Sequence, residues 1–383
     1  MTAPLAGIVV VSLEQAVSAP LATRHLADLG ATVIKVERPE GDFARHYDSV
    51  VDGNSAFFVW GNRGKQSVTC DLSDPEQERF LHSLIAGADV FVHNVAPEVA
   101  TRRGLDVDTL TARHPSLIAC EVSGFGAGGP RSQDKAYDMV IQAEAGVFSV
   151  CGDGDAMSKV GFSVADISAA MYVLSSVLAA IIRRDRTGEG AAIRVSMLDA
   201  LAEWVSAPLY AAVYGSGQAP RTGRRHHAIA PYGTFRLSDG STILFSVQND
   251  REWQQMAEIV LERPELGTDP RFATNSDRIA NVDALEPMII EAFAAIPAAE
   301  TLDRLGRARI AIAHVNDLRG VWNHDQLRAR GHFHSVQTEH GPVELIDPPF
   351  DISGVPVALG AIPALGEHDP ALIQRIVERG LTD

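Results

Sequence analysis

The chain has 383 residues, of which 46% are hydrophobic and 21% charged, and its formal net charge at pH 7 is −16. This length exceeds what one ordinary hydrophobic core spans, so we expect two domains. The negative charge argues against nucleic acid as a partner, because phosphate contacts need clustered Lys and Arg, although a few local basic residues can still bind an anionic cofactor.

Cysteine use and hydropathy predict the compartment. Cys70, Cys120 and Cys151 are widely separated and odd in number, which predicts neither a disulfide framework nor a metal site and favours a reducing cytoplasm. The N-terminus lacks a basic region followed by a long apolar core, and we find no uninterrupted run of about 18 apolar residues. We therefore expect a cytoplasmic protein that is neither secreted nor membrane-spanning.

Short β-branched runs alternate with helical patterns over the first half of the chain. Strands are expected at residues 8–11, 32–37, 68–72, 89–94, 117–123 and 191–197. Helices are expected at residues 20–29 and 75–86. This alternation predicts an α/β fold with a doubly wound parallel sheet. No G-x-G-x-x-G opens the first helix, so NAD-type binding is not supported.

A long helix is expected to begin near Asp166. Ser163 lies three residues earlier, close to a capping-box pattern, which places the carboxylate in the first turn. Unpaired backbone N–H groups and the helix macrodipole stabilise an anion there, so we expect an ionised group available as nucleophile or base. An Asp in a first turn is more often only a helix cap.

Composition shifts to Gly, Pro, Arg and His at residues 215–230, the clearest linker in the sequence. Its basic residues fit either a solvated linker or an attractor for phosphates, and both interpretations stay open; they are Arg221, Arg224, Arg225, His226 and His227. After the linker, Asp239-Gly240 between two β-rich runs predicts a hairpin.

The remaining pattern predicts a smaller α+β domain. Helices are expected at residues 250–261, 282–295 and 301–308, and a strand at residues 310–315. The expected organisation is a large domain at 1–214, a linker at 215–230, a small domain at 231–325, and a return to the large domain at 326–383.

Other catalytic patterns are missing from the sequence. Neither H-x-x-x-H nor H-E-x-x-H occurs among its 13 His, so we do not expect a metal site. The G-x-S-x-G pattern of a serine nucleophile is also missing. A catalytic carboxylate is the most economical hypothesis.

Several motifs are spread along nearly the whole chain. They are Ala19-Pro20, Leu29-Gly30-Ala31, the run from Val33 to Pro39, Asn62-Arg63-Gly64-Lys65, Asp71-Leu72, Tyr137-Asp138 with Gln142-Ala143 and Gly146, Val164-Ala165-Asp166, Thr187-Gly188-Glu189-Gly190, and Gly366-Glu367-His368. Together and in this order they resemble the motifs of the family III CoA-transferases, whose superfamily includes the α-methylacyl-CoA racemases. The resemblance implies a Rossmann-like large domain, a smaller domain, and a homodimer of two interlocked rings.

The resemblance also implies a mechanism and a set of site residues. Asp166 would attack the acyl-CoA thioester, giving an acyl-aspartyl anhydride and then an aspartyl-CoA thioester that passes CoA to an acceptor acid. Both intermediates hydrolyse, so water must be excluded. The implied CoA-binding residues are Ala16 and Val17 at the mouth of the site, Arg38, Arg102 and Lys135 at the phosphates or adenine, Leu72 and Asn94 beside the nucleotide, and Tyr137 near the acyl carbon.

The racemases are the nearest alternative. They carry a His where Tyr137 stands, and a tyrosine with an ordinary pKa near 10 is a poor proton shuttle at neutral pH, which favours the transferase. A non-catalytic CoA-binding protein and a nicotinamide oxidoreductase are hypotheses from other classes.

The substrate acids are expected to be small dicarboxylates such as succinate, mesaconate or itaconate. Val17 replaces a Gln of the formyl-CoA enzymes, and no polyglycine lid occurs between Gly215 and Gly233, which points away from formate and oxalate. Arg45, His46 or a linker arginine is expected to pair with the distal carboxylate.

Overall fold

The computed structural model describes residues 3–215, 217–355 and 359–379; the other positions of the expected domains lie outside the described residues. The chain divides into two compact units. The first comprises residues 1–147, 159–207 and 326–383, and the second comprises residues 148–158 and 208–325. Residues 208–230, where we expected the end of the large domain and the linker, fall in the second unit.

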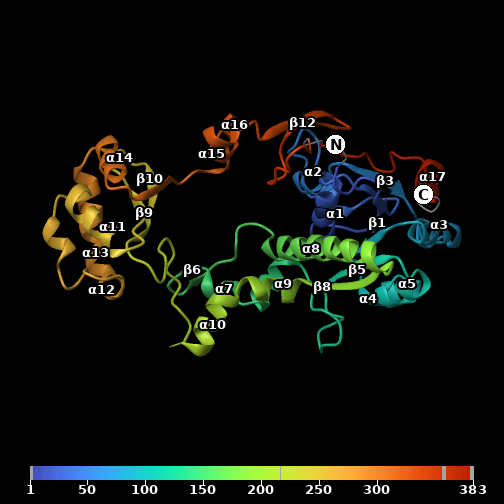
Figure 1. Ribbon diagram of the computed structural model, residues 1–383, viewed down its shortest axis with the longest axis horizontal. Coiled ribbons are helices and arrows are strands. Elements are labelled where there is room, and N and C mark those ends of the chain that lie inside the picture. The colour runs from blue at the N-terminus through green and yellow to red at the C-terminus, as the bar shows by residue number, and fades with distance from the viewer. Residues whose placement is uncertain (1–2, 216, 356–358, 380–383) are drawn as a thin grey trace. The chain divides into compact units, whose positions relative to one another are not determined.

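The first unit is built on a six-stranded parallel sheet with strand order β3-β2-β1-β4-β5-β8 (Figure 1). The strands are β1 Val9–Leu13, β2 Thr32–Glu37, β3 Lys65–Thr69, β4 Val90–His93, β5 Ile118–Ser123 and β8 Ala191–Ser196. The mixed α/β fold with a parallel sheet is therefore confirmed. Strand β3 begins earlier than predicted, because the buried Lys65 already pairs with Val33 of β2.

Helices cover both faces of this sheet. On one face, α1 Ser18–Asp28 packs against α8 Val164–Thr187, with α1 contacting β2 and β4 and α8 contacting β5 and β8. The other face is covered by α3 Pro75–Ala86, α4 Pro97–Arg103, α5 Val107–Arg113 and α17 Pro370–Arg379. Successive residues of β1 point to opposite faces of the sheet. Val9 and Val11 belong to the core beneath α3, α4, α5 and α17, whereas Val10 is buried on the face covered by α1 and α8.

Shorter elements complete this unit and lead to the next. The first unit also contains α2 Ala56–Asn62, α6 Asp138–Glu144, α9 Met197–Trp204 and the hairpin of β12 Phe333–Thr338 and β13 Gly341–Ile346. The chain passes from one unit to the other within α7 Val147–Val150, between residues 158 and 159, within α10 Ser206–Tyr214 and within α16 Asp325–Ala329.

The second unit is an α+β structure around a three-stranded antiparallel sheet in the order β11-β10-β9. Its elements are β6 Gly152–Asp153, β7 Ala156–Met157, β9 Tyr232–Arg236, β10 Thr242–Ser246, α11 Asp250–Gln255, α12 Asn275–Ala280, α13 Val282–Ala295, α14 Ala298–Arg307, β11 Ala311–His314 and α15 Leu318–Trp322. The predicted hairpin is present as β9 and β10. The core contains the stacked Phe235 and Phe245 rings, with Phe293 against both.

The second unit also contains the basic residues of the segment that we expected to be a linker. Arg224 and Arg225 pair with Glu286 and Asp283 at 3.1 and 3.2 Å, and the His226 ring stacks on Tyr232. These contacts favour a structural role over that of a free attractor for phosphates.

Helix α8 differs from our expectation in one respect. By length and composition alone its 24 residues could cross a membrane, although no uninterrupted apolar run was found, because its many Ala, Val, Leu and Ile side chains keep the mean hydropathy high despite the interspersed polar residues. Within the protein, 44% of its most apolar window is buried.

Candidate active site

A cleft of about 1080 Å³, solvent included, opens in the first unit beside the carboxyl ends of β1, β4 and β5. Ligands of open α/β sheets usually bind at this edge. Asp166 lies in its wall, and four of the predicted residues line the same cleft, namely Ala16, Asn94, Lys135 and Tyr137.

Asp166 is the third residue of α8, as the sequence predicted. The capping box does not form, since among the described residues no side-chain capping bond from Ser163 is present. Asp138 caps this helix start from outside the helix, its Oδ1 accepting from the backbone N–H of Ala165 at 2.8 Å. Ser18, the first residue of α1, donates to the Asp166 carboxylate from both its hydroxyl and its backbone N–H. The N-termini of α1 and α8 therefore meet at this carboxylate.

Burial raises the pKa of Asp166 to about 7, the Asp138 carboxylate adds to the rise, and the hydrogen bonds from Ser18 oppose it. We expected the helix N-terminus to hold this side chain firmly ionised, and that expectation was wrong in its net effect. Desolvation of the carboxylate and a neighbouring like charge outweigh the local N–H donors. The result is a carboxyl group poised to change charge near neutral pH.

Asp138 is a site residue that the sequence reasoning did not single out. Its Oδ1 accepts from Ala165, its Oδ2 accepts from the Gln142 side chain at 2.7 Å, and Gln142 Oε1 accepts from Val160 N–H at 2.9 Å. The signal was available, since Asp138 and Gln142 both belong to the motif that carries the family resemblance and lie one helical turn apart.

The loop after β1 forms another part of the cleft wall. Asn94 holds this loop in both directions, because its Oδ1 accepts from Gln15 N–H at 3.0 Å and its amide donates to Gln15 O at 2.8 Å. Ala16 lies in the lining, whereas the Val17 side chain is 5% exposed and packs inside. Ser18 was not predicted, because only the meeting of α1 and α8 gives it a role.

Arg38, Leu72 and Arg102 lie outside the lining of this cleft, in the segments that follow β2, β3 and β4. Arg38 is exposed, its Nε donates to Gly41 O at 2.8 Å, and its guanidinium lies 5.8 Å from the centre of the Phe43 ring. Arg38 and Leu72 come shortly after the ends of β2 and β3 and share the carboxyl edge of the sheet with the cleft, whereas Arg102 lies in the last turn of α4.

Arg45 does not fit the expected role of pairing with a distal carboxylate. Its Nε and Nη2 bind Glu37 at 2.9 and 2.7 Å, and its Nη1 donates to Pro363 O at 3.1 Å. The guanidinium also stacks on the Phe58 ring at 3.7 Å. Because every nitrogen of the guanidinium is engaged, we assign Arg45 a structural role. Lys135 is instead the exposed cation in the cleft lining.

Metal-ligating side chains do not gather in the described ranges. No group of three or more His, Cys, Asp or Glu suited to a metal ion occurs there. The cysteines are unpaired thiols, with Cys70 and Cys120 buried.

Comparison with known proteins covers almost the whole chain. The family described as CoA-transferase family III matches residues 5–369. The chain is 33% identical over 375 residues to an acetyl-CoA:oxalate CoA-transferase of Acetobacter aceti, spanning 96% of this chain and 95% of that protein. It is 32% identical over 393 residues to a succinate–glutarate CoA-transferase of Agrobacterium fabrum, spanning 99% and 98%. The crystal structure of a CaiB/BaiF family protein from Brucella suis superposes with a TM-score of 0.87 at 32% identity and covers 98% of this chain and 100% of that chain.

Proposed function

Because the chain belongs to CoA-transferase family III, we propose that it moves CoA from an acyl-CoA donor to a small dicarboxylic acid through transient acylation of Asp166. The observation that carries this proposal is the pKa of Asp166, which burial raises to about 7 in the wall of the cleft. A carboxylate with this pKa is a stronger nucleophile than an ordinary one, yet a large fraction is still ionised at neutral pH.

The reaction proceeds in four exchanges. The Asp166 carboxylate attacks the thioester carbonyl, the C–S bond breaks, and CoA leaves as a thiolate beside an acyl-aspartyl anhydride. The thiolate then attacks the aspartyl carbonyl and releases the donor acid, leaving an aspartyl-CoA thioester. The acceptor carboxylate attacks that thioester to form a second anhydride, and the thiolate attacks its acyl carbonyl, which regenerates Asp166.

The cleft supports a role for these residues in holding CoA. Lys135 supplies a positive charge at the cleft, Arg38 supplies another along the same edge of the sheet, and Arg102 supplies a third from the last turn of α4. We propose that the pantetheine arm lies along Ala16 and Asn94 and that the phosphates meet the cations. Leu72 and Val17 then contribute apolar contacts, Leu72 beside the nucleotide and Val17 behind the loop.

The donor and acceptor acids are proposed from the relatives. Their names include oxalate, succinate and glutarate, all dicarboxylates. The likeness to an oxalate transferase returns oxalate to the candidates, although the sequence departures pointed away from it. Mesaconate and itaconate stay on the list as acids of the same chemical class.

The test is a matrix of acyl-CoA donors and dicarboxylic acids analysed by mass spectrometry. We expect a second acyl-CoA to form with at least one pair, and Asp166→Asn to abolish it. Incorporation of deuterium at the α-carbon of a branched acyl-CoA without an acceptor would instead favour the racemase. Tyr137 in the cleft lining, where racemases carry a His, makes exchange of CoA the expected outcome.

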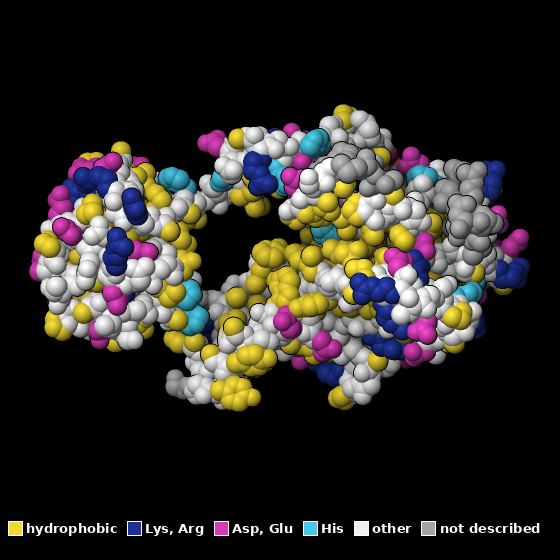
Figure 2. Space-filling view, in the orientation of Figure 1, with side chains coloured by type: hydrophobic (Ala, Val, Ile, Leu, Met, Phe, Trp, Pro, Cys, Tyr) yellow, Lys and Arg dark blue, Asp and Glu magenta, His cyan; other side chains and the backbone are white. Residues whose placement is uncertain are grey.

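We also propose that the protein is a homodimer of interlocked chains in the cytoplasm. Figure 2 shows hydrophobic side chains gathered over α8 of the first unit, and the exposed residues of this helix include Met171 and Ile182. An exposed apolar face of this kind is typical of a protein interface. Light scattering should give twice the chain mass of 41.1 kDa; a mass of one chain at micromolar concentration would refute the dimer.

A further inference from the structure

The loop at residues 14–18 carries a strained backbone into the cleft. Ala16 has φ of +64°, a left-handed conformation that an L-residue with a Cβ adopts only at an energetic cost. Ser18, two residues later, donates both of its hydrogen bonds to Asp166. Something must hold Ala16 in this conformation for Ser18 to keep its place.

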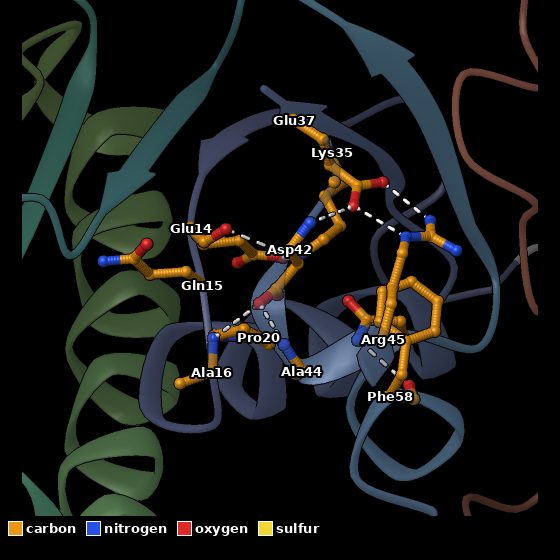
Figure 3. Close-up of polar contacts among 12 residues, drawn as sticks. Glu14, Gln15, Ala16, Pro20, Lys35, Glu37, Asp42, Ala44, Arg45 and Phe58 are labelled. Atoms are coloured by element: carbon orange, nitrogen blue, oxygen red, sulfur yellow. Dashed lines mark hydrogen bonds and ion pairs between the residues drawn. The ribbon is translucent and has the colours of Figure 1, made fainter. Parts of the chain in front are cut away.

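Asp42 supplies that restraint (Figure 3). Its Oδ1 accepts from the backbone N–H groups of Ala16 at 3.0 Å and Ala44 at 2.9 Å. Its Oδ2 binds Lys35 Nζ at 2.9 Å. The side chains of Asp42 and Lys35 are both fully buried, so these bonds are shielded from water.

Lys35 links the Asp42 carboxylate to Glu14, at the start of the loop. Its ammonium donates to Glu14 O at 3.4 Å and lies 3.6 Å from Glu14 Oε1. Lys65, also fully buried, binds Glu14 Oε1 at 2.6 Å and Pro20 O at 2.8 Å, on the far side of the loop. The loop is therefore clamped at both ends by buried charges that line no part of the cleft.

We propose that Asp42 is a positioning residue for the transferase reaction, which holds Ala16 in its left-handed conformation so that Ser18 meets the Asp166 carboxylate. The catalytic part of this inference rests on the proposed function. Its structural part, the dependence of the Ser18–Asp166 contact on Asp42, does not.

Asp42→Asn tests the two contacts of the carboxylate, one with Ala16 and one with Lys35. Both oxygens accept from donors, so an amide can satisfy only the Lys35 side or the Ala16 side, whichever way it turns. The variant should lower kcat roughly ten- to one-hundred-fold, the range expected when a hydrogen bond to a charged group is lost. Asp42→Glu keeps the charge that Lys35 needs but changes the reach, and it serves as the second variant if the first does not fold.

Asp28→Asn is the matched control. Asp28 is also a buried acid of the first unit, with its side chain 2% exposed, and it binds Arg24 at 2.6 Å and Arg63 at 2.8 Å away from the cleft. We expect this variant to lose stability as Asp42→Asn does and to retain kcat at temperatures where it is folded.

The pKa of Asp166 gives a readout that a general loss of stability does not move. This pKa can be measured from the pH dependence of carbodiimide labelling, followed by peptide mass spectrometry. The measurement does not require turnover. Loss of the Ser18 bonds should raise the pKa by about one pH unit. Removal of the negative charge of Asp42 would by itself lower the pKa of Asp166. The direction of the measured pKa change therefore distinguishes a positioning role of Asp42 from a direct electrostatic effect. The other groups facing Asp166 are Asp138, Tyr47, Tyr137 and Lys135, and none is altered.

A second substitution tests the route through Ala16. Glycine enters the left-handed region without the Cβ penalty, so Ala16→Gly added to Asp42→Asn should restore kcat about fivefold or more relative to Asp42→Asn alone. The proposal is overturned if neither Asp42 variant raises the pKa of Asp166, or if glycine rescues nothing. If the wild type transfers no CoA but the pKa rises as expected, the proposed function fails and the positioning role stands.

Discussion

Asp166→Asn removes a carboxyl group whose pKa burial raises from 3.8 to about 7. Between about pH 4 and pH 7 the folded protein keeps a proton on this group that the unfolded chain has released. Stability therefore falls as the pH rises through that range, the opposite of a salt-bridged carboxylate. Asparagine carries no such penalty, so the variant should be inactive and more stable than the wild type at neutral and alkaline pH.

The magnitude follows from the difference between the two pKa values. At about 1.36 kcal/mol per pH unit, a rise from 3.8 to about 7 corresponds to roughly 4 kcal/mol above pH 7. Asp166 is only half-buried, so we expect about 2–4 kcal/mol. The gain should shrink steadily as the pH falls towards 4 and vanish at lower pH, where both states are protonated.

The assay is urea unfolding of both proteins at pH 5, 6.5 and 8, followed by tryptophan fluorescence. Asp185→Asn, which replaces an exposed carboxylate on the same helix, reports the general effect of removing one negative charge. A gain for Asp166→Asn that does not depend on pH, or a loss of stability at pH 8, would show that the fold does not disfavour this charge.

Further outcomes are expected from the same geometry. kcat/KM should rise with pH and level off above an apparent pKa near 7, because only ionised Asp166 attacks. Asp138→Asn should move that pKa down by about half a unit to one unit, since a neighbouring like charge is removed; a pH–rate profile checks both. Lys135→Ala should raise KM for acyl-CoA roughly tenfold with less effect on kcat, and Lys135→Arg should retain most of the affinity. In the second unit, Phe245→Ala should lower the free energy of unfolding by about 3–5 kcal/mol, because the ring is fully buried, as thermal unfolding can test.

The centre of the sheet was predictable because β1 and β4 are nearly continuous apolar runs. Such runs signal strands buried on both faces, and the alternation with helices fixes a parallel arrangement. Strand β3 was misplaced because it opens with the charged Lys65, whose burial depends on Glu14 in another strand-end segment. No local pattern shows that a lysine has a buried partner distant in the sequence.

The site was predictable only where its geometry is local. Asp166 could be placed in a first helical turn, since a helix start has a sequence signature. Ser18 and Asp138 could not be assigned roles, because both act through contacts with a helix far away in sequence. The capping box was expected from spacing alone, whereas in the structure Asp138 caps the N–H of Ala165 from outside the helix and Ser163 makes no side-chain cap. A pattern of four residues cannot register a cap that comes from elsewhere in the chain.

The groups around Asp166 shift its pKa in opposite directions. This balance suits a carboxyl group that must act both as the attacking nucleophile and as the leaving group. Donors alone would hold the carboxylate ionised and weakly nucleophilic, while burial alone would keep it protonated. Here burial and Asp138 raise the pKa, and Ser18 limits the rise. Since Ser18 depends on a loop clamped by Asp42, the balance is set by buried charges outside the cleft. A change at Asp42 should thus alter the chemistry of Asp166 without touching any substrate.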